Sequence, residues 1–231
     1  CFTAHIGERL HQYKFPVLHN STGIVFDAGS IATQLDHIIK LKTYTAADLF
    51  KHNGLWNCWF YHSDFSNPDS ETALHQLNQA IQINHFFLKK ATHLIITIGT
   101  AWSYRLKENG MHVANCHKVP QTAFNKVLSP VSEMTAALQQ TINALLEFNP
   151  ELHILLTVSP VRHIRDGLVD NNRSKARVLE TIHALCENNV ACTYFPAYEL
   201  GIDVLRDYRW YASALAHPNQ AAVDFVFDHF S

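Results

Sequence analysis

His217, near the end of the chain, is the residue whose type and place best suit acid–base chemistry. It lies in the run 208–218 between two amphipathic segments, where we expect a loop. An imidazole has a pKa of about 6.5, so it takes up and returns a proton near neutral pH. A loop histidine that faces a cleft is therefore a candidate general base. The alternative is a surface histidine without a function, because the chain holds 16 histidines.

Four more candidate site residues directly follow apolar runs. They are Thr100, Trp102, Arg162 and His163. In an open parallel sheet, ligands bind beyond the carboxyl ends of the strands, where loops and helix N-termini gather. The polar groups of Arg162 and His163 suit a carboxylate, a phosphate or a sugar, and we predict that all four residues bind substrate. For the neighbouring Gly99 and Pro160, turn formation alone is the alternative role.

Apolar runs and helical patterns alternate along the chain. The runs are 93–98, 153–158 and 190–195. Each is short, rich in β-branched residues and continuously apolar, as is typical of parallel strands covered on both faces. The segments with apolar residues at three- and four-residue spacing are 70–91, 130–147 and 172–188. We predict that these segments are helices. Strands alternating with helices predict an α/β fold with a doubly wound parallel sheet.

The N-terminal part is less regular. Helical patterns cover 2–13 and 29–42, and residues 24–26 are expected to be a short extended piece. The aromatic run 55–62 is interpreted as a core strand. Stacking of its rings on sugars is the alternative.

A hairpin is expected at 104–115, because Asn109-Gly110 at its centre suits a tight turn between two strands. The sequence contains no repeat, no linker and no low-complexity stretch. We therefore predict a single domain over residues 1–231.

Composition indicates a globular protein with a small partner. Hydrophobic residues make up 47% and charged residues 16% of the 231, and the formal net charge is -2. That charge gives no electrostatic reason to expect nucleic acid. No apolar run approaches the roughly 20 residues that span a bilayer. We expect a small-molecule or glycan partner, no nucleic acid and no membrane span.

Cysteine usage argues against a disulfide framework and against a zinc site. The five cysteines, Cys1, Cys58, Cys116, Cys186 and Cys192, are scattered and form no CxxC. No His-x-x-x-His with a nearby carboxylate occurs in a helical frame. We predict no metal and no cofactor. The chain opens on Cys1 without Met, so we expect a processed piece whose upstream signal could have been lost. Residues 1–20 lack the regions of a signal peptide, which favours the cytoplasm.

Short motifs follow one another almost from end to end. The main ones are 1–10 (CFTAHIGERL), 22–26 (TGIVF) with 30–32 (SIA), 99–102 (GTAW), 115–118 (NCHK), 159–163 (SPVRH) with 166–167 (DG), 174–176 (SKA), 194–199 (YFPAYE) and 205–209 (LRDYR) through His217-Pro218. In this order they resemble the GSCFA family, named after a Gly-Ser-Cys-Phe-Ala motif and similar to the SGNH (GDSL-like) hydrolases. The resemblance implies a flavodoxin-like α/β fold, whose first strand is missing from this chain.

The resemblance also implies a site for ester hydrolysis. Its nucleophile would be a serine directly before Cys1, whose own amide would point into the oxyanion hole. Gly23 matches the glycine of that hole, with Asn20 and Thr22 as alternative donors, and Asn115 is the nearest substitute for its asparagine. His217 matches the base. His117, in the same motif as Asn115, is also a candidate substrate-binding residue.

Two departures weaken this match. Ala101 stands where the family's third motif has asparagine, and Ala214 stands where the aspartate of Asp-x-x-His belongs. An orienting carboxylate fixes the tautomer of the base, and its replacement in serine proteases costs about 10⁴ in rate. Asp203 or Asp207 from the preceding segment is a possible substitute.

Three functions follow from these observations. The leading hypothesis is a serine hydrolase that cleaves an acyl ester of a carbohydrate or lipid-like molecule. The second is a catalytically impaired domain that binds a glycan or small acylated ligand in the same cleft. The third is an enzyme that uses the thiol of Cys1, with its α-amine as base. A dyad of Cys116 and His117 is discounted, because neighbours on an extended strand point to opposite faces.

Overall fold

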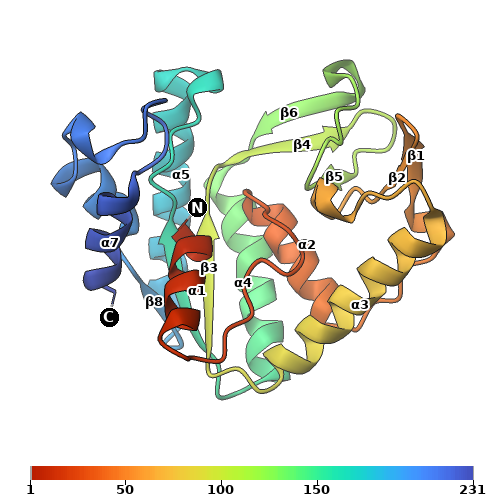
Figure 1. Cartoon of the computed structure of the whole chain (residues 1–231), viewed down its shortest axis with the longest axis horizontal. Helices are drawn as coiled ribbons and strands as arrows, with labels where there is room; N and C mark the ends of the chain where they lie inside the picture. The colour runs from red at the N-terminus through yellow and green to blue at the C-terminus, as the bar shows by residue number, and fades with distance from the viewer. Residues whose placement is uncertain (1, 231) are drawn as a thin grey trace. The chain divides into compact units, whose positions relative to one another are not determined.

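The computed structural model describes residues 2–230, and its contacts divide the chain into two compact units. The first unit comprises Cys1–His19, His93–Ala101 and His153–Ser231. The second comprises Asn20–Thr92 and Trp102–Leu152. The units alternate along the chain, so segments far apart in the sequence build each of them. Helices and strands are labelled in Figure 1.

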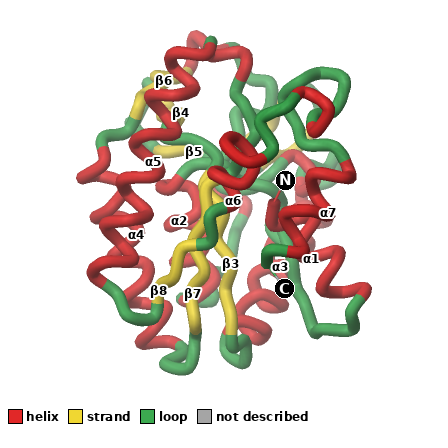
Figure 2. The backbone as a smooth tube through the Cα atoms, turned by 90° about the vertical axis from the view of Figure 1, so that its left-hand side faces the viewer, coloured by secondary structure: helices red, strands yellow, loops and turns green. Residues whose placement is uncertain are grey.

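A parallel sheet forms the centre of the first unit. Its strands are β3 (His93–Ile98), β7 (His153–Val158) and β8 (Cys192–Tyr194), in the order β3-β7-β8. Figure 2 shows the three strands side by side. His93 pairs with His153 and Ile98 with Val158, so β3 and β7 end level with each other. The loops that follow them therefore leave the sheet at the same edge.

Helices pack against this sheet. They are α1 (Phe2–Gln12), α5 (Leu168–Asn188), α6 (Ala197–Glu199) and α7 (Gln220–Asp228), with one turn of π-helix at Leu200–Val204. α5 contacts β7 and β8, α1 contacts β3, and α7 contacts α1. Val178, Ile182 and Leu185 of α5 are fully buried. Burial of this apolar stripe stabilises the helix more than its intrinsic propensity does.

The second unit combines three helices with antiparallel strands. The helices are α2 (Ala28–Ile39), α3 (Ser70–Leu88) and α4 (Val131–Phe148), and α2 contacts both of the others. One sheet has the order β5-β4-β6, from β4 (Trp102–Leu106), β5 (His112–Val113) and β6 (Phe124–Leu128). A second pairs β1 (Phe50–His52) with β2 (Leu55–Asn57). Single 3-10 turns lie at Ala46–Asp48, Ser63–Phe65, Gln121–Ala123, Ile164–Asp166 and Tyr208–Trp210.

The predicted α/β class, the three parallel strands and all five long helices are confirmed. The strand predicted at 190–195 is shorter, because only Cys192–Tyr194 pairs with β7. The helix predicted at 172–188 begins earlier, at Leu168. Leu168 and Val169 are exposed, so their positions break the apolar stripe that marks a helix in a sequence.

Two predictions in the second unit need correction. The strand predicted at 55–62 is wrong beyond Asn57, because the chain turns there and buries Tyr61 completely. The hairpin at 104–115 is confirmed, with Tyr104 paired to Val113. Its loop is longer than a two-residue turn, since the strands stop at Leu106 and His112. β6, which completes this sheet, was not expected.

Candidate active site at the carboxyl edge of the parallel sheet

His217 lies in a small hairpin that returns toward α7. Tyr211 and Pro218 form an antiparallel bridge, and the Ala212 amide donates a 2.8 Å hydrogen bond to the His217 carbonyl. Leu215 at the tip has a φ of 54°, which lets the chain reverse. The side chain of His217 is exposed. The predicted loop position of this imidazole is thus confirmed, and its backbone is held by local pairing.

Arg162, predicted to bind substrate, braces this hairpin. Its amide donates to the Ala216 carbonyl at 3.3 Å, and Nη1 donates to the Leu215 carbonyl at 3.5 Å. Nη2 donates to the Tyr211 hydroxyl at 3.2 Å, and the guanidinium lies 4.5 Å from the centre of that ring. Three contacts and one stacked ring fix the hairpin to the loop after β7. The role that the structure gives Arg162 is therefore positioning.

An apolar pocket opens beside the hairpin, within the first unit. Its lining includes His5, Ile6, Leu205, Trp210, Pro218 and Val223. Almost all of the lining is carbon. Tyr211 and Pro218, which pair in the hairpin that carries His217, line this pocket, and an apolar space of this kind suits a hydrocarbon chain.

His5 of α1 is an ionisable residue of this pocket lining. Burial lowers the pKa of His5, Glu8 opposes the shift from 3.9 Å, and the nearby His217 adds to the lowering. His5 and His217 thus lie close enough to influence each other. The N-terminal helix and the C-terminal hairpin therefore meet at the pocket.

A buried polar stripe on α5 organises the strand ends. Asn171, Ser174 and Lys175 are 6%, 2% and 1% exposed and share one helix face. Asn171 Oδ1 accepts a hydrogen bond from the His163 amide at 2.9 Å. Ser174 Oγ accepts from the Ala101 amide at 2.8 Å and lies 2.9 Å from Thr100 Oγ1. Thr100, predicted to bind substrate, thus contacts α5.

Lys175 reaches the ends of two strands at once. Its Nζ donates to the carbonyls of Gly99 and Ser159, both at 2.6 Å. Asn171, Ser174 and Lys175 were not predicted as site residues. The sequence did contain an indication of their role. Polar residues at 171, 174 and 175 lie on the same helix face as the buried residues at 178, 182 and 185. A polar residue on the buried face of a helix requires a hydrogen-bond partner, so such a pattern predicts a specific polar contact in the core.

Four other predicted site residues, Gly23, Trp102, Asn115 and His117, belong to the second unit. The amide of Gly23 donates to the Asn20 carbonyl at 2.8 Å, within a turn where Gly23 has a φ of 81°. Asn115 Oδ1 accepts from the His117 amide at 2.8 Å. The indole of Trp102, on β4, lies under Lys126 Nζ, 4.6 Å from the ring centre. These contacts are local, and the predicted roles of Gly23, Asn115 and Trp102 in catalysis and binding stay predictions.

His117 lies in the core of the second unit. It is 7% exposed, and its Nε2 lies 2.8 Å from the Cys58 carbonyl. Burial lowers the pKa of His117, while burial raises the pKa of Cys58 to about 12 and that of Cys116 to about 11. These thiols stay protonated near neutral pH and are poor nucleophiles. Cys1 lies outside the described residues.

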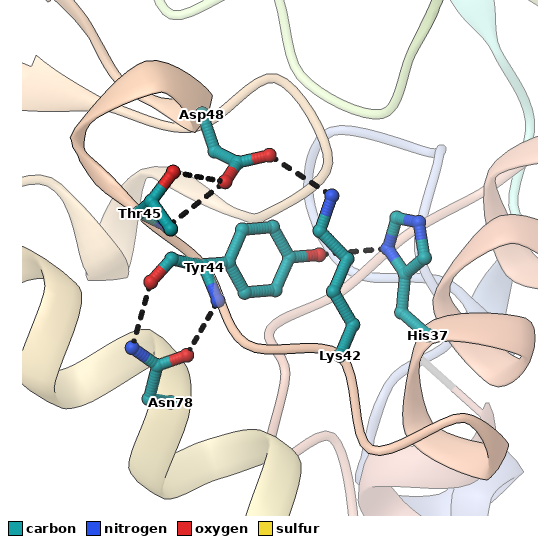
Figure 3. Close-up of polar contacts among 6 residues, drawn as sticks. All are labelled: His37, Lys42, Tyr44, Thr45, Asp48 and Asn78. Carbon is teal, nitrogen blue, oxygen red and sulfur yellow. Dashed lines mark hydrogen bonds and ion pairs between the residues drawn. The ribbon is translucent and has the colours of Figure 1, made fainter.

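A polar cluster around Tyr44 in the second unit is structural (Figure 3). The Tyr44 hydroxyl lies 2.7 Å from His37 Nδ1, and the Tyr44 backbone exchanges two hydrogen bonds with the side chain of Asn78. Asp48 accepts from Lys42 Nζ at 2.9 Å and from Thr45. These contacts fix the segment after α2 to α3. The polar groups of these residues bind one another, so the cluster stabilises the fold of this segment.

Neither a metal cluster nor a membrane-spanning helix is found in residues 2–230. No group of three His, Cys, Asp or Glu side chains there is arranged to hold a metal ion. None of the helices in that stretch is both long and apolar enough to cross a bilayer.

Comparison with known proteins identifies the family. The fold is an α/β arrangement around a parallel sheet, with a histidine-bearing hairpin and a pocket at its carboxyl edge. The GSCFA family model matches residues 1–230, and the chain therefore belongs to the GSCFA family. No curated protein and no solved structure matches the chain.

Proposed function

We propose that this chain is a serine ester hydrolase of the SGNH type, acting on a molecule that carries an apolar acyl group. The observation that carries the proposal is the position of the His217 hairpin at the rim of the apolar pocket. A serine esterase needs a proton acceptor near the reacting carbonyl and a place for the acyl chain. Membership of the GSCFA family supports the same conclusion.

The proposed reaction has two stages. The hydroxyl of a serine, which the family resemblance places directly before Cys1, attacks the ester carbonyl and passes its proton to His217. His217 then gives that proton to the leaving alcohol, and water releases the acyl group by the same route. The carbonyl oxygen becomes negative in each stage. N–H donors aimed at that oxygen would stabilise the negative charge.

The missing aspartate predicts a slow enzyme. Ala214 stands three residues before His217, and Asp207 is occupied as the N-cap of a 3-10 turn, where it accepts from the Arg209 amide at 2.9 Å. In serine proteases, replacing the carboxylate that orients the base costs about 10⁴ in rate. Ala214→Asp is therefore expected to raise turnover.

The test uses the protein extended to include the upstream serine. We expect a fluorophosphonate probe to label it and a medium-chain p-nitrophenyl ester to be hydrolysed. His217→Ala should lower kcat at least about 10²-fold, the effect typical of losing a general base. His11→Ala, which replaces an exposed histidine of α1, is the matched control and should leave kcat unchanged. Equal activity of the His217→Ala and His11→Ala variants would refute the proposal.

The second candidate function is a binding domain for a small acylated ligand. It is favoured by Ala214, because a site that only binds has no need of an oriented base. It predicts that the acylated ligand binds while neither the extended wild type nor the Ala214→Asp variant turns over an ester. Probe labelling of the serine would exclude it.

A further inference from the structure

We propose that Lys175 is a positioning residue of this site, whose buried side-chain nitrogen ties the ends of β3 and β7 together and so sets the geometry of the loops that follow them. The kinetic part of this inference rests on the proposed ester hydrolysis. The structural part does not.

The contacts of Lys175 are those of a cross-link between strands. Nζ donates to the Gly99 carbonyl, just after β3, and to the Ser159 carbonyl, just after β7, both at 2.6 Å. β3 and β7 are paired up to Ile98 and Val158, and the Ser159 amide donates to the Ile98 carbonyl at 3.0 Å. Lys175 therefore continues the connection one step beyond the last strand bond.

Burial shows why a lysine stands there. The residue is 1% exposed, and no carboxylate within residues 2–230 contacts its nitrogen. Two backbone carbonyls that are buried without a donor would each cost about 1–3 kcal/mol. One lysine nitrogen supplies both donors, whether it is an ammonium or a neutral amine. Burial lowers the pKa of Lys175 to about 7.

The loops that Lys175 fixes are the ones that carry the site. After Gly99 comes Thr100-Ala101, which Ser174 also binds, and after Ser159 comes Pro160, which lines the pocket. Arg162, two residues further on, braces the His217 hairpin. A shift of about 1 Å in catalytic groups costs about 10²-fold in rate, so loosening this junction is expected to act on the chemical step.

The experiment compares three variants of the extended protein. Lys175→Met keeps the length of the side chain and removes its donors, and Lys175→Arg keeps donors. Arg173→Met removes a cation from the exposed face of the same helix and is the matched control. Hydrogen exchange at the Ala101 and Ser159 amides reports the geometry of the loops, with the Ile182 amide as a reference for global unfolding. kcat and KM report the reaction.

We expect Lys175→Met to speed exchange at Ala101 and Ser159 at least about tenfold relative to Ile182, and to lower kcat about 10–100-fold with little change in KM. Lys175→Arg should restore part of both, and Arg173→Met should change neither. Unchanged exchange at the two amides in Lys175→Met would overturn the inference. If hydrogen exchange at these amides becomes faster in Lys175→Met while kcat stays unchanged, the positioning role is likewise overturned.

Two further results keep the tests separate. If the wild type hydrolyses no ester, the proposed function fails, and the exchange data still decide whether Lys175 fixes the loops. If Lys175→Met does not fold, the ¹⁵N signal of Lys175 Nζ in the wild type decides instead. A nitrogen that titrates near pH 7 and whose protons exchange slowly supports the cross-link. A signal like that of an exposed lysine overturns it.

Discussion

Arg162 and Lys175, which hold the loops of this site in place, show more about how the site is organised than the candidate base His217 does. His217 is exposed on its hairpin, whereas Arg162 and Lys175 each make several directed contacts. Arg162 combines hydrogen bonds with stacking on Tyr211, a pairing that a lysine does not reproduce. Residues of this kind hold catalytic groups in place without touching the substrate.

Burial of Lys175 predicts a pH-dependent stability. Its pKa is lowered from 10.5 to about 7 in the folded protein, so between these values the unfolded chain holds a proton that the native state lacks. Stability from this residue is lowest at pH 7 and below, and rises with pH up to about 10.5. Relative to Lys175→Met, the free energy of unfolding of the wild type should rise by up to about 1.4 kcal/mol per pH unit between pH 7 and 9.

Urea unfolding at several pH values measures this difference. Parallel curves for the wild type and Lys175→Met would show that the lysine titrates alike in both states. Arg173→Met serves as the reference for removing a cation from an exposed position of the same helix.

At the scale of elements, the N-cap residues of α2 and α3 differ in the contacts that their carboxylates make. Asp27 caps α2 by accepting from the Ser30 amide at 3.0 Å, and its Oδ1 also lies 2.8 Å from His112 Nε2 on β5. Asp69 caps α3 through Thr72 alone and is exposed. The Asp27 cap thus joins a helix to a strand, while the contacts of the Asp69 cap stay within the first turn of its own helix.

This difference predicts that replacing the two capping aspartates lowers the free energy of unfolding by unequal amounts. Asp27→Ala loses a cap and a partner for His112 in a buried place, and should lower the free energy of unfolding by about 2–3 kcal/mol. Asp69→Ala is the matched control and should cost clearly less, because water reaches the freed amide. Asp27→Asn keeps the capping oxygen and should recover part of the loss. Equal costs for Asp27→Ala and Asp69→Ala in urea unfolding would contradict this reading.

At the scale of the whole molecule, histidines that folding partly or fully removes from water are expected to set the response to acid. Burial is the main cause that lowers the pKa of His5, His37 and His117 below 6.5. As the pH falls through 6.5, the unfolded chain binds protons that the native state still rejects, so stability falls. The loss begins above the range in which carboxylates titrate.

Urea unfolding at pH 7.5 and pH 5.5 checks this expectation. The midpoint should be lower at pH 5.5, and His117→Gln should reduce the difference between the two values. His11→Ala, at an exposed position, should leave the difference unchanged. A midpoint that does not move between these pH values would contradict the prediction.

Much of the first unit was predictable from local patterns. The strands His93–Ile98 and His153–Val158 were expected with their observed bounds, because continuous β-branched runs leave little choice of conformation. β6, with the sequence FNKVL, was missed because its polar residues interrupt the apolar pattern. The aromatic run after Asn57 was misjudged, because ring burial there follows from packing around a turn and not from strand alternation.

The sequence by itself determined the α/β class, the loop position of His217 and the family, since periodicity and ordered motifs are local properties of a chain. Tertiary structure alone decided that Arg162 braces the His217 hairpin, that His117 is a core residue and that Lys175 bridges two strand ends. The physical reason is the distance along the chain between the residues in contact. These contacts join residues tens of positions apart, and a buried polar group is satisfied only by the partner that folding brings to it.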